Sequence, residues 1–194
     1  MNKRTTIILG IILAVCCVAG GVVLAIASFG VSQSNETYGE LSEACFGNAV
    51  PDAAAYAATS GSHPAIGMKL YGTSYSTYNY PIPENALAAS VSETQVVFCM
   101  GDQDKALLER CPYIVDNSDQ PTHIVERYQY ELAIKLVEAK TGILIAEETL
   151  VGKPPRECLD EETFLEGSET VAVDGDKVSD ADIQAWLRQY IIIP

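Results

Sequence analysis

This chain of 194 residues has few histidines, one tryptophan and few basic residues. Its two histidines are His63 and His123, and the chain has neither an H-E-x-x-H nor a G-x-S-x-G sequence. Ser62 adjoins His63, but proximity in sequence does not make a nucleophile and a base. The sequence therefore favours structural histidines, and it predicts no catalytic residue and no cofactor.

Basic side chains are also scarce: 12 Lys and Arg stand against 26 Asp and Glu, which gives a formal net charge of −14. Nucleic acids and anionic membrane surfaces need a basic face, so both are excluded as partners. Runs such as Glu147-Glu148 and Asp160-Glu161-Glu162 are typical of solvated faces. A carboxylate pair could still serve hydrolysis, so a small carboxylate-dependent hydrolase of the cell envelope remains an alternative function.

No charge occurs from Ile7 to Ala27, and this apolar run would span about 30 Å as a helix, the thickness of a bilayer core. Lys3 and Arg4 precede it, and the next basic residue is Lys69. The positive-inside rule then predicts a cytoplasmic stub (1–6), a transmembrane signal anchor (7–27) in contact with the lipid bilayer, and an extracellular or periplasmic remainder.

Two other interpretations of the apolar run remain open. Ala25-Ile26-Ala27 is an acceptable cleavage site for a signal peptide, although the run is longer than an ordinary signal core. Cys16 follows a sequence similar to a bacterial lipobox, but Val15 is bulky for the position before a lipidated cysteine. We expect an uncleaved anchor.

Closely spaced metal-binding cysteines are absent as well. Four cysteines follow the apolar run, and no C-x-x-C pair occurs among them. An even number in an oxidising compartment predicts two disulfides, with three possible connectivities. These cysteines are Cys45, Cys99, Cys111 and Cys158.

Residues 28–44 are polar and aperiodic, which indicates a juxtamembrane linker, and residues 45–194 then form one domain. Regular structure is clearest after residue 93. The segment 94–100 is typical of a strand, "GDQD" (101–104) of a turn, and "KALLERC" (105–111) of the returning strand of a hairpin.

The segment 123–138 alternates between two sets of side chains and predicts a long, half-buried strand. Gly142 can take the positive φ of a tight turn, so "ILIAEETLV" (143–151) should return as the partner strand. Pro154 and Pro155 end it, and Cys158 should pin the exit to the sheet.

The closing helix is expected from about Asp180 to Tyr190. Its apolar residues recur at helical spacing and form one face for the sheet; they are Ile183, Trp186, Leu187 and Tyr190. The expected fold class is α+β, an antiparallel β-sheet domain with a C-terminal helix packed on it, behind the transmembrane helix.

A run of aspartates at the start of this helix could form a calcium-binding loop. These residues are Asp174, Asp176, Asp180 and Asp182. In an EF-hand register glycine belongs at position 6, and here Asp176 occupies it while Gly175 falls on a ligand position. Ser179 and Asp182 instead have the spacing of a capping box, and Asp174-Gly175 is typical of a turn. Capping is the preferred interpretation, and calcium-dependent adhesion is a second alternative function.

One stretch resembles a binding surface, because tyrosine rings with polar tips can stack on sugars or peptides. It holds Tyr71, Tyr75, Tyr78 and Tyr80. The same residues could instead pack over a sheet edge, and the sequence favours that reading while leaving an envelope protein or a glycan as possible ligands.

Four short motifs carry a family resemblance: Cys111-Pro112-Tyr113, Lys140-Thr141-Gly142, "GKPPREC" (152–158) and Ala185-Trp186-Leu187. With them, residues 45–190 resemble an uncharacterised extracytoplasmic domain of membrane-anchored or secreted prokaryotic proteins. The resemblance implies a disulfide-linked β architecture and no catalytic residues. The function expected is that of a non-catalytic binding or accessory domain.

Overall fold

The computed structural model describes residues 38–57, 59–114 and 118–194. Its helices are η1 (Gly39–Leu41), α2 (Ser42–Cys45), η2 (Glu84–Ala86), η3 (Val91–Glu93) and α3 (Asp180–Ile191). Its strands are β1 (Gly61–Ser62), β2 (Ala65–Tyr71), β3 (Ser74–Thr77), β4 (Val96–Tyr113), β5 (His123–Glu138), β6 (Leu144–Val151), β7 (Thr170–Asp174) and β8 (Ile192–Ile193).

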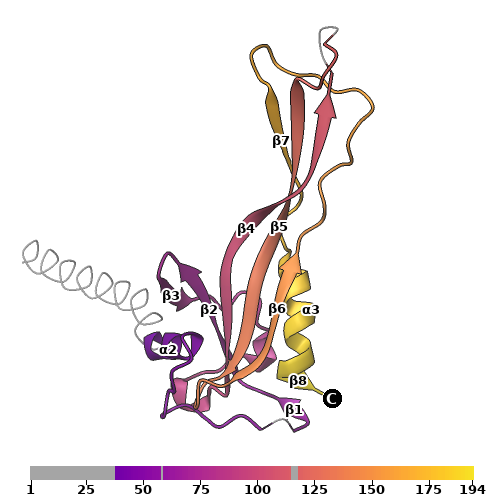
Figure 1. The fold of residues 1–194 in the computed structure, drawn as a ribbon. Helices are drawn as coiled ribbons and strands as arrows, with labels where there is room; N and C mark the ends of the chain where they lie inside the picture. The colour runs from indigo at the N-terminus through magenta and orange to yellow at the C-terminus, as the bar shows by residue number, and fades with distance from the viewer. Residues whose placement is uncertain (1–37, 58, 115–117) are drawn as a thin grey trace, which may run out of the picture.

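The main sheet has six strands in the order β3-β2-β4-β5-β6, and β7 pairs with β5 beyond the end of β6 (Figure 1). The α+β class with a C-terminal helix on the sheet is confirmed, but the sheet is mixed and not purely antiparallel. β2 runs parallel to β4, and β7 runs parallel to β5. The sequence patterns detected hairpins, which join antiparallel neighbours, whereas a parallel pair is joined through a longer connection that leaves no local signal.

The predicted hairpin of β5 and β6 is confirmed. β5 covers His123–Glu138, and β6 returns from Leu144 to Val151. Gly142 has a φ of +72° in the turn, as its lack of a Cβ allows. The alternation of β5 therefore predicted the strand and, from Leu132 to Leu136, its buried side.

The predicted turn at 101–104 is wrong, because β4 continues from Val96 to Tyr113 as one strand. Its pairing with β5 shifts register between Met100 and Gln103 and again between Leu107 and Glu109. A β-bulge absorbs the extra residue and keeps the strand going. The glycine and aspartate that suggested a turn lie at the first shift.

α3 covers one face of the sheet with the residues that the sequence predicted. Ile183, Trp186 and Leu187 are buried there, and Tyr190 packs partly buried against the same cluster. The cluster also contains Phe98 and Leu136 from the sheet. The indole of Trp186 lies 6.2 Å from the ring of Phe98, measured between centroids.

The opposite face of the sheet is covered by η1 and α2. Leu41 and Ala44 are fully buried in a second cluster, although the sequence placed them in a linker ending at residue 44. The Cys45–Cys99 disulfide joins α2 to β4 inside this cluster. The domain therefore begins before Cys45, because two apolar side chains ahead of it complete the core.

No helix within residues 38–57, 59–114 and 118–194 is long and apolar enough to cross a membrane. The predicted cytoplasmic stub, the signal anchor 7–27 and the cleavage site at Ala27 lie outside the described residues.

Candidate functional site

The distal half of the β4–β5 hairpin extends away from both hydrophobic clusters (Figure 1). We call this part the arm; it consists of residues 103–114, 123–131 and 153–174. At about 3.3 Å per residue, its part of β5 is about 26 Å long. The lower half of the molecule, with α2, α3 and both clusters, is called the body.

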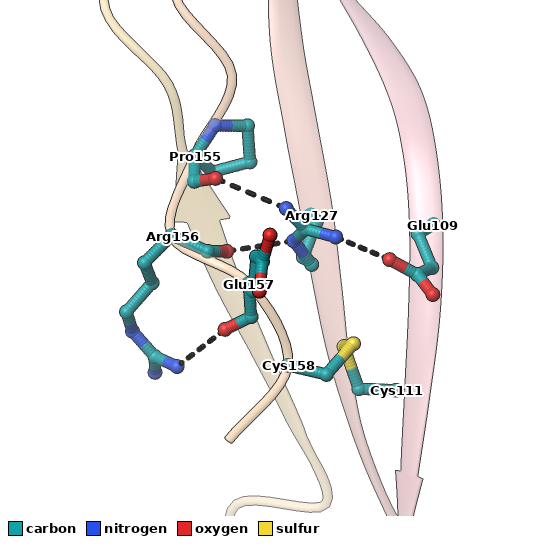
Figure 2. Close-up of polar contacts among 7 residues, drawn as sticks. All are labelled: Glu109, Cys111, Arg127, Pro155, Arg156, Glu157 and Cys158. Carbon is teal, nitrogen blue, oxygen red and sulfur yellow. Dashed lines mark hydrogen bonds and ion pairs between the residues drawn. A yellow bond between two sulfur atoms is a disulfide. The ribbon is translucent and has the colours of Figure 1, made fainter.

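A buried arginine braces the arm (Figure 2). Arg127 lies opposite Glu109 in the strand register, and its guanidinium forms an ion pair with that carboxylate. Its Nε donates to the carbonyl of Arg156 at 2.7 Å, and Nη2 donates to the carbonyl of Pro155 at 3.0 Å. Only 9% of the Arg127 side chain is exposed. The rigid fork of guanidinium donors thus fixes the segment 155–156 across β4 and β5.

The second disulfide, between Cys111 and Cys158, lies beside this arginine (Figure 2). It confirms that Cys158 pins the exit from β6 to the sheet. Nearer the tip, the hydroxyl of Tyr113 donates to the carbonyl of Leu159 at 2.9 Å. Phe164 packs on Tyr113 and on His123, with ring centroids 5.5 and 4.6 Å away. One face of the arm is therefore covered by the segment 155–164.

The opposite face of the arm carries a different set of polar contacts. Tyr128 Oη donates to Glu126 Oε2 at 2.6 Å, and Arg110 Nε donates to Glu126 Oε1 at 3.0 Å. The bond from Tyr128, with a smaller contribution from Arg110, holds the pKa of Glu126 below its ordinary value. The same bond raises the pKa of Tyr128.

We expect Tyr128→Phe to raise the pKa of Glu126, because the carboxylate loses its strongest donor. Since the native pKa is lowered, the contribution of Glu126 to stability is fully present above the pKa of Glu126 in the unfolded chain and is lost as the pH falls through the lower pKa of the folded state. A carboxyl titration by NMR measures the shift. Tyr130→Phe is the control, because Tyr130 lies on the same face; an equal shift in both variants would contradict the assignment.

Aliphatic side chains are exposed over much of the arm. Leu107 and Leu108 at the β4 bulge are 44% and 48% exposed, and Ile114 near the tip is 60% exposed. Leu165, which directly follows the covering segment 155–164, is 80% exposed. Exposed apolar side chains on an element that projects from the core are candidates for an interaction surface.

The structure divides the four predicted tyrosines between two faces of the sheet. Tyr71 and Tyr78 flank Lys69, whose Nζ lies 5.4 and 5.6 Å from their ring centroids. Tyr75 packs against the α2 side and meets the ring of Phe46 at 5.2 Å. Tyr80 is exposed. They do not form one continuous surface, and a role for them in binding stays a prediction.

Two of the four predicted aspartates, one in β7 and one in the first turn of α3, have other partners. Asp174 forms an ion pair with Lys105 of β4. Asp182 and Ser179 form the predicted capping box, which is confirmed: the Ser179 hydroxyl accepts from the Asp182 backbone N–H, and the Asp182 carboxylate accepts from the Ser179 backbone N–H. The aspartate run thus begins a helix and joins β7 to β4.

We expect Ser179→Ala to lower the free energy of unfolding by about 1 kcal/mol, because an N-terminal backbone N–H of α3 loses its acceptor. Denaturation in urea, with and without calcium, measures the effect. Asp176→Ala is the matched control. A calcium-dependent loss at Asp176 and none at Ser179 would reverse the interpretation.

Both histidines have structural contacts. His63 is buried, with Nδ1 at 2.8 Å from Gln95 Oε1 and Nε2 at 2.9 Å from the Thr59 carbonyl. His123 is on the arm, in contact with Phe164.

Glu147 and Glu148 both border a hollow of about 440 Å³, but consecutive strand residues point to opposite faces. Glu109, Cys111 and Cys158 lie close together, yet the cysteines are disulfide-bonded and have no free thiolate for a metal.

Sequence reasoning missed Arg127 and the arm. Arg127 belongs to the polar side of β5 by alternation, which predicts an exposed side chain. The structure buries it because the segment 155–156 crosses over it, and that contact joins residues far apart in the chain. A charged residue within an alternating strand carries no signal of such a cover.

Comparison of this chain with protein-family models, with curated proteins and with solved structures finds no match.

Proposed function

We propose that this chain is a membrane-anchored, extracytoplasmic interaction domain without catalytic activity, and that the arm is its contact surface. The observation that carries the proposal is the arm itself. It lies outside both hydrophobic clusters, it is braced by the Cys111–Cys158 disulfide and by Arg127, and it presents exposed aliphatic side chains. A rigid projection with apolar side chains binds a partner at a low cost in conformational entropy.

The position of the first described residues supports this orientation. η1 and α2 pack on the body, so the predicted anchor would join the chain to the body (Figure 1). The arm would then be left free to reach a second protein of the envelope. The predicted resemblance to extracytoplasmic domains without assigned activity is consistent with such a role.

The test uses the full-length chain in its native membrane, with a photo-crosslinking residue at the arm tip next to Ile114. We expect a discrete cross-linked partner, and we expect Ile114→Asp to reduce its yield at least tenfold. Ile143→Asp is the matched control, because Ile143 is exposed to the same degree, 62% against 60%, in the turn of the β5–β6 hairpin. Equal yields from both variants, or no partner at all, would overturn the arm as contact surface.

A further inference from the structure

A groove separates the edge strand β6 from α3. It has a volume of about 360 Å³, and Glu148, Thr149, Leu150 and Val151 line one side of it. Asp182, Ala185, Trp186 and Gln189 line the other. The groove lies on the body and shares no residue with the arm, so the two are separate surfaces.

The backbone of β6 offers hydrogen-bonding groups along this groove. The Gly152 N–H donates to the Tyr130 carbonyl, so the pair 130/152 is hydrogen-bonded in the ladder. In an antiparallel ladder such pairs alternate, and the pairs of Val151, Thr149 and Glu147 are therefore the non-bonded ones. Their N–H and C=O groups point away from β5, and among the described residues no strand or loop pairs with them.

α3 provides a matching wall. Asp182, Ala185 and Gln189 lie at helical spacing on the side that faces the groove, and the small Ala185 is between the two longer side chains. Trp186 also borders the groove, and its buried indole N–H has no hydrogen-bond partner within the described part of the chain. Buried donors are nearly always satisfied, so this N–H is a candidate contact for a bound acceptor.

We propose that the groove binds an extended, positively charged peptide segment, which adds to β6 as an extra strand. The backbone of the peptide would pair with the outward groups of Glu147, Thr149 and Val151, and alternate side chains would pack on Ala185. Glu148 and Asp182 supply negative charge from both walls. This charge favours lysine or arginine in the peptide and repels a second copy of the acidic β6.

The proposal goes beyond the role of the arm, because it concerns another surface and another class of ligand. A partner protein bound at the arm tip could also supply such a segment, but the groove does not depend on that. The arm and the groove are tested with different variants, so a negative result for the arm leaves the groove proposal standing, and the reverse is also true.

The test uses the full-length chain and a capped eight-residue peptide of alternating valine and lysine. Trp186 is the only tryptophan of the chain and borders the groove, so its fluorescence reports binding. We expect saturable binding that weakens with salt, and we expect no binding of the same peptide with glutamate in place of lysine. The arm variant Ile114→Asp should bind the peptide as the wild type does.

Thr149→Pro removes an outward N–H and leaves the hydrogen bonds to β5 in place, so it should weaken binding at least tenfold. Thr149→Val keeps the N–H and should bind normally. If Thr149→Pro does not fold, Ala185→Phe at the exposed helix position fills the groove, keeps Trp186 as the single reporter and should have the same effect. Normal binding by the folded Thr149→Pro or Ala185→Phe variant, or no binding at about 1 mM peptide, overturns the proposal.

Discussion

Replacing Cys45 and Cys99 together by alanine is expected to lower the free energy of unfolding by about 2–5 kcal/mol. The bond closes a span of 54 residues, and in the chain-entropy model its loss releases about 4 kcal/mol of restraint on the unfolded chain. Both cysteines are also buried in the cluster between α2 and the sheet. The loss of contacts there adds to the entropic effect.

The double variant of Cys111 and Cys158 is the matched comparison, because its span of 47 residues is nearly the same. Unfolding in guanidinium, followed by the fluorescence of Trp186 in the body, should show a smaller loss for this variant. Hydrogen exchange should instead increase across residues 155–164, because the arm opens locally when its disulfide is absent. Equal losses of global stability in the two variants would show that the arm and body unfold as one unit.

Gly152→Ala is expected to lower the free energy of unfolding by about 3 kcal/mol and to loosen the junction between the arm and the body. The chain passes Gly152 where β6 ends and passes Gly175 where β7 ends, and the two segments touch at the base of the arm. A Cβ on Gly152 would lie 1.9 Å from the carbonyl oxygen of Asp176, and a Cβ on Gly175 would lie 2.2 Å from that of Lys153. Neither neighbour is a flexible side chain, so the backbone itself would have to move.

The contacts at this junction would be lost together. The Gly152 and Gly175 N–H groups donate to the carbonyls of Tyr130 and Tyr128, both at 2.8 Å, and the Asp176 N–H donates to the Lys153 carbonyl at 3.0 Å. Gly39→Ala is the control, because a Cβ there meets nothing within 4 Å and its φ is not positive. Denaturation and hydrogen exchange measure both variants; a Gly152→Ala protein as stable as Gly39→Ala would refute the close approach.

Gly175 also corrects an expectation from the sequence. Asp174-Gly175 has the composition of a turn, but the structure has no turn there: β7 ends at Asp174, the next residues take no regular structure, and the φ of Gly175 is not positive. Glycine is needed there because two backbones meet, which depends on a segment more than twenty residues away along the chain. The glycine in the sequence indicated an unusual backbone position, but the residues next to it in the chain do not show that a second backbone segment passes there.

The local elements of this protein follow from its sequence. The alternation of residues 123–138 predicted β5, the spacing of Ile183, Trp186 and Leu187 predicted the buried face of α3, and Ser179 with Asp182 predicted its cap. Each of these depends on neighbours within one strand or one helical turn. Side-chain periodicity and capping hydrogen bonds act over that distance, and a single sequence displays them directly.

Tertiary structure alone decided the rest. Five features join segments that are far apart in the chain. They are the parallel pairing of β2 with β4, the continuation of β4 through residues 101–104, the cover over Arg127, the choice of disulfide pairs and the groove beside β6. Such contacts depend on how the whole chain closes on itself. Composition and local pattern determined an acidic, disulfide-linked α+β domain, and the closing of the chain determined its arm and its groove.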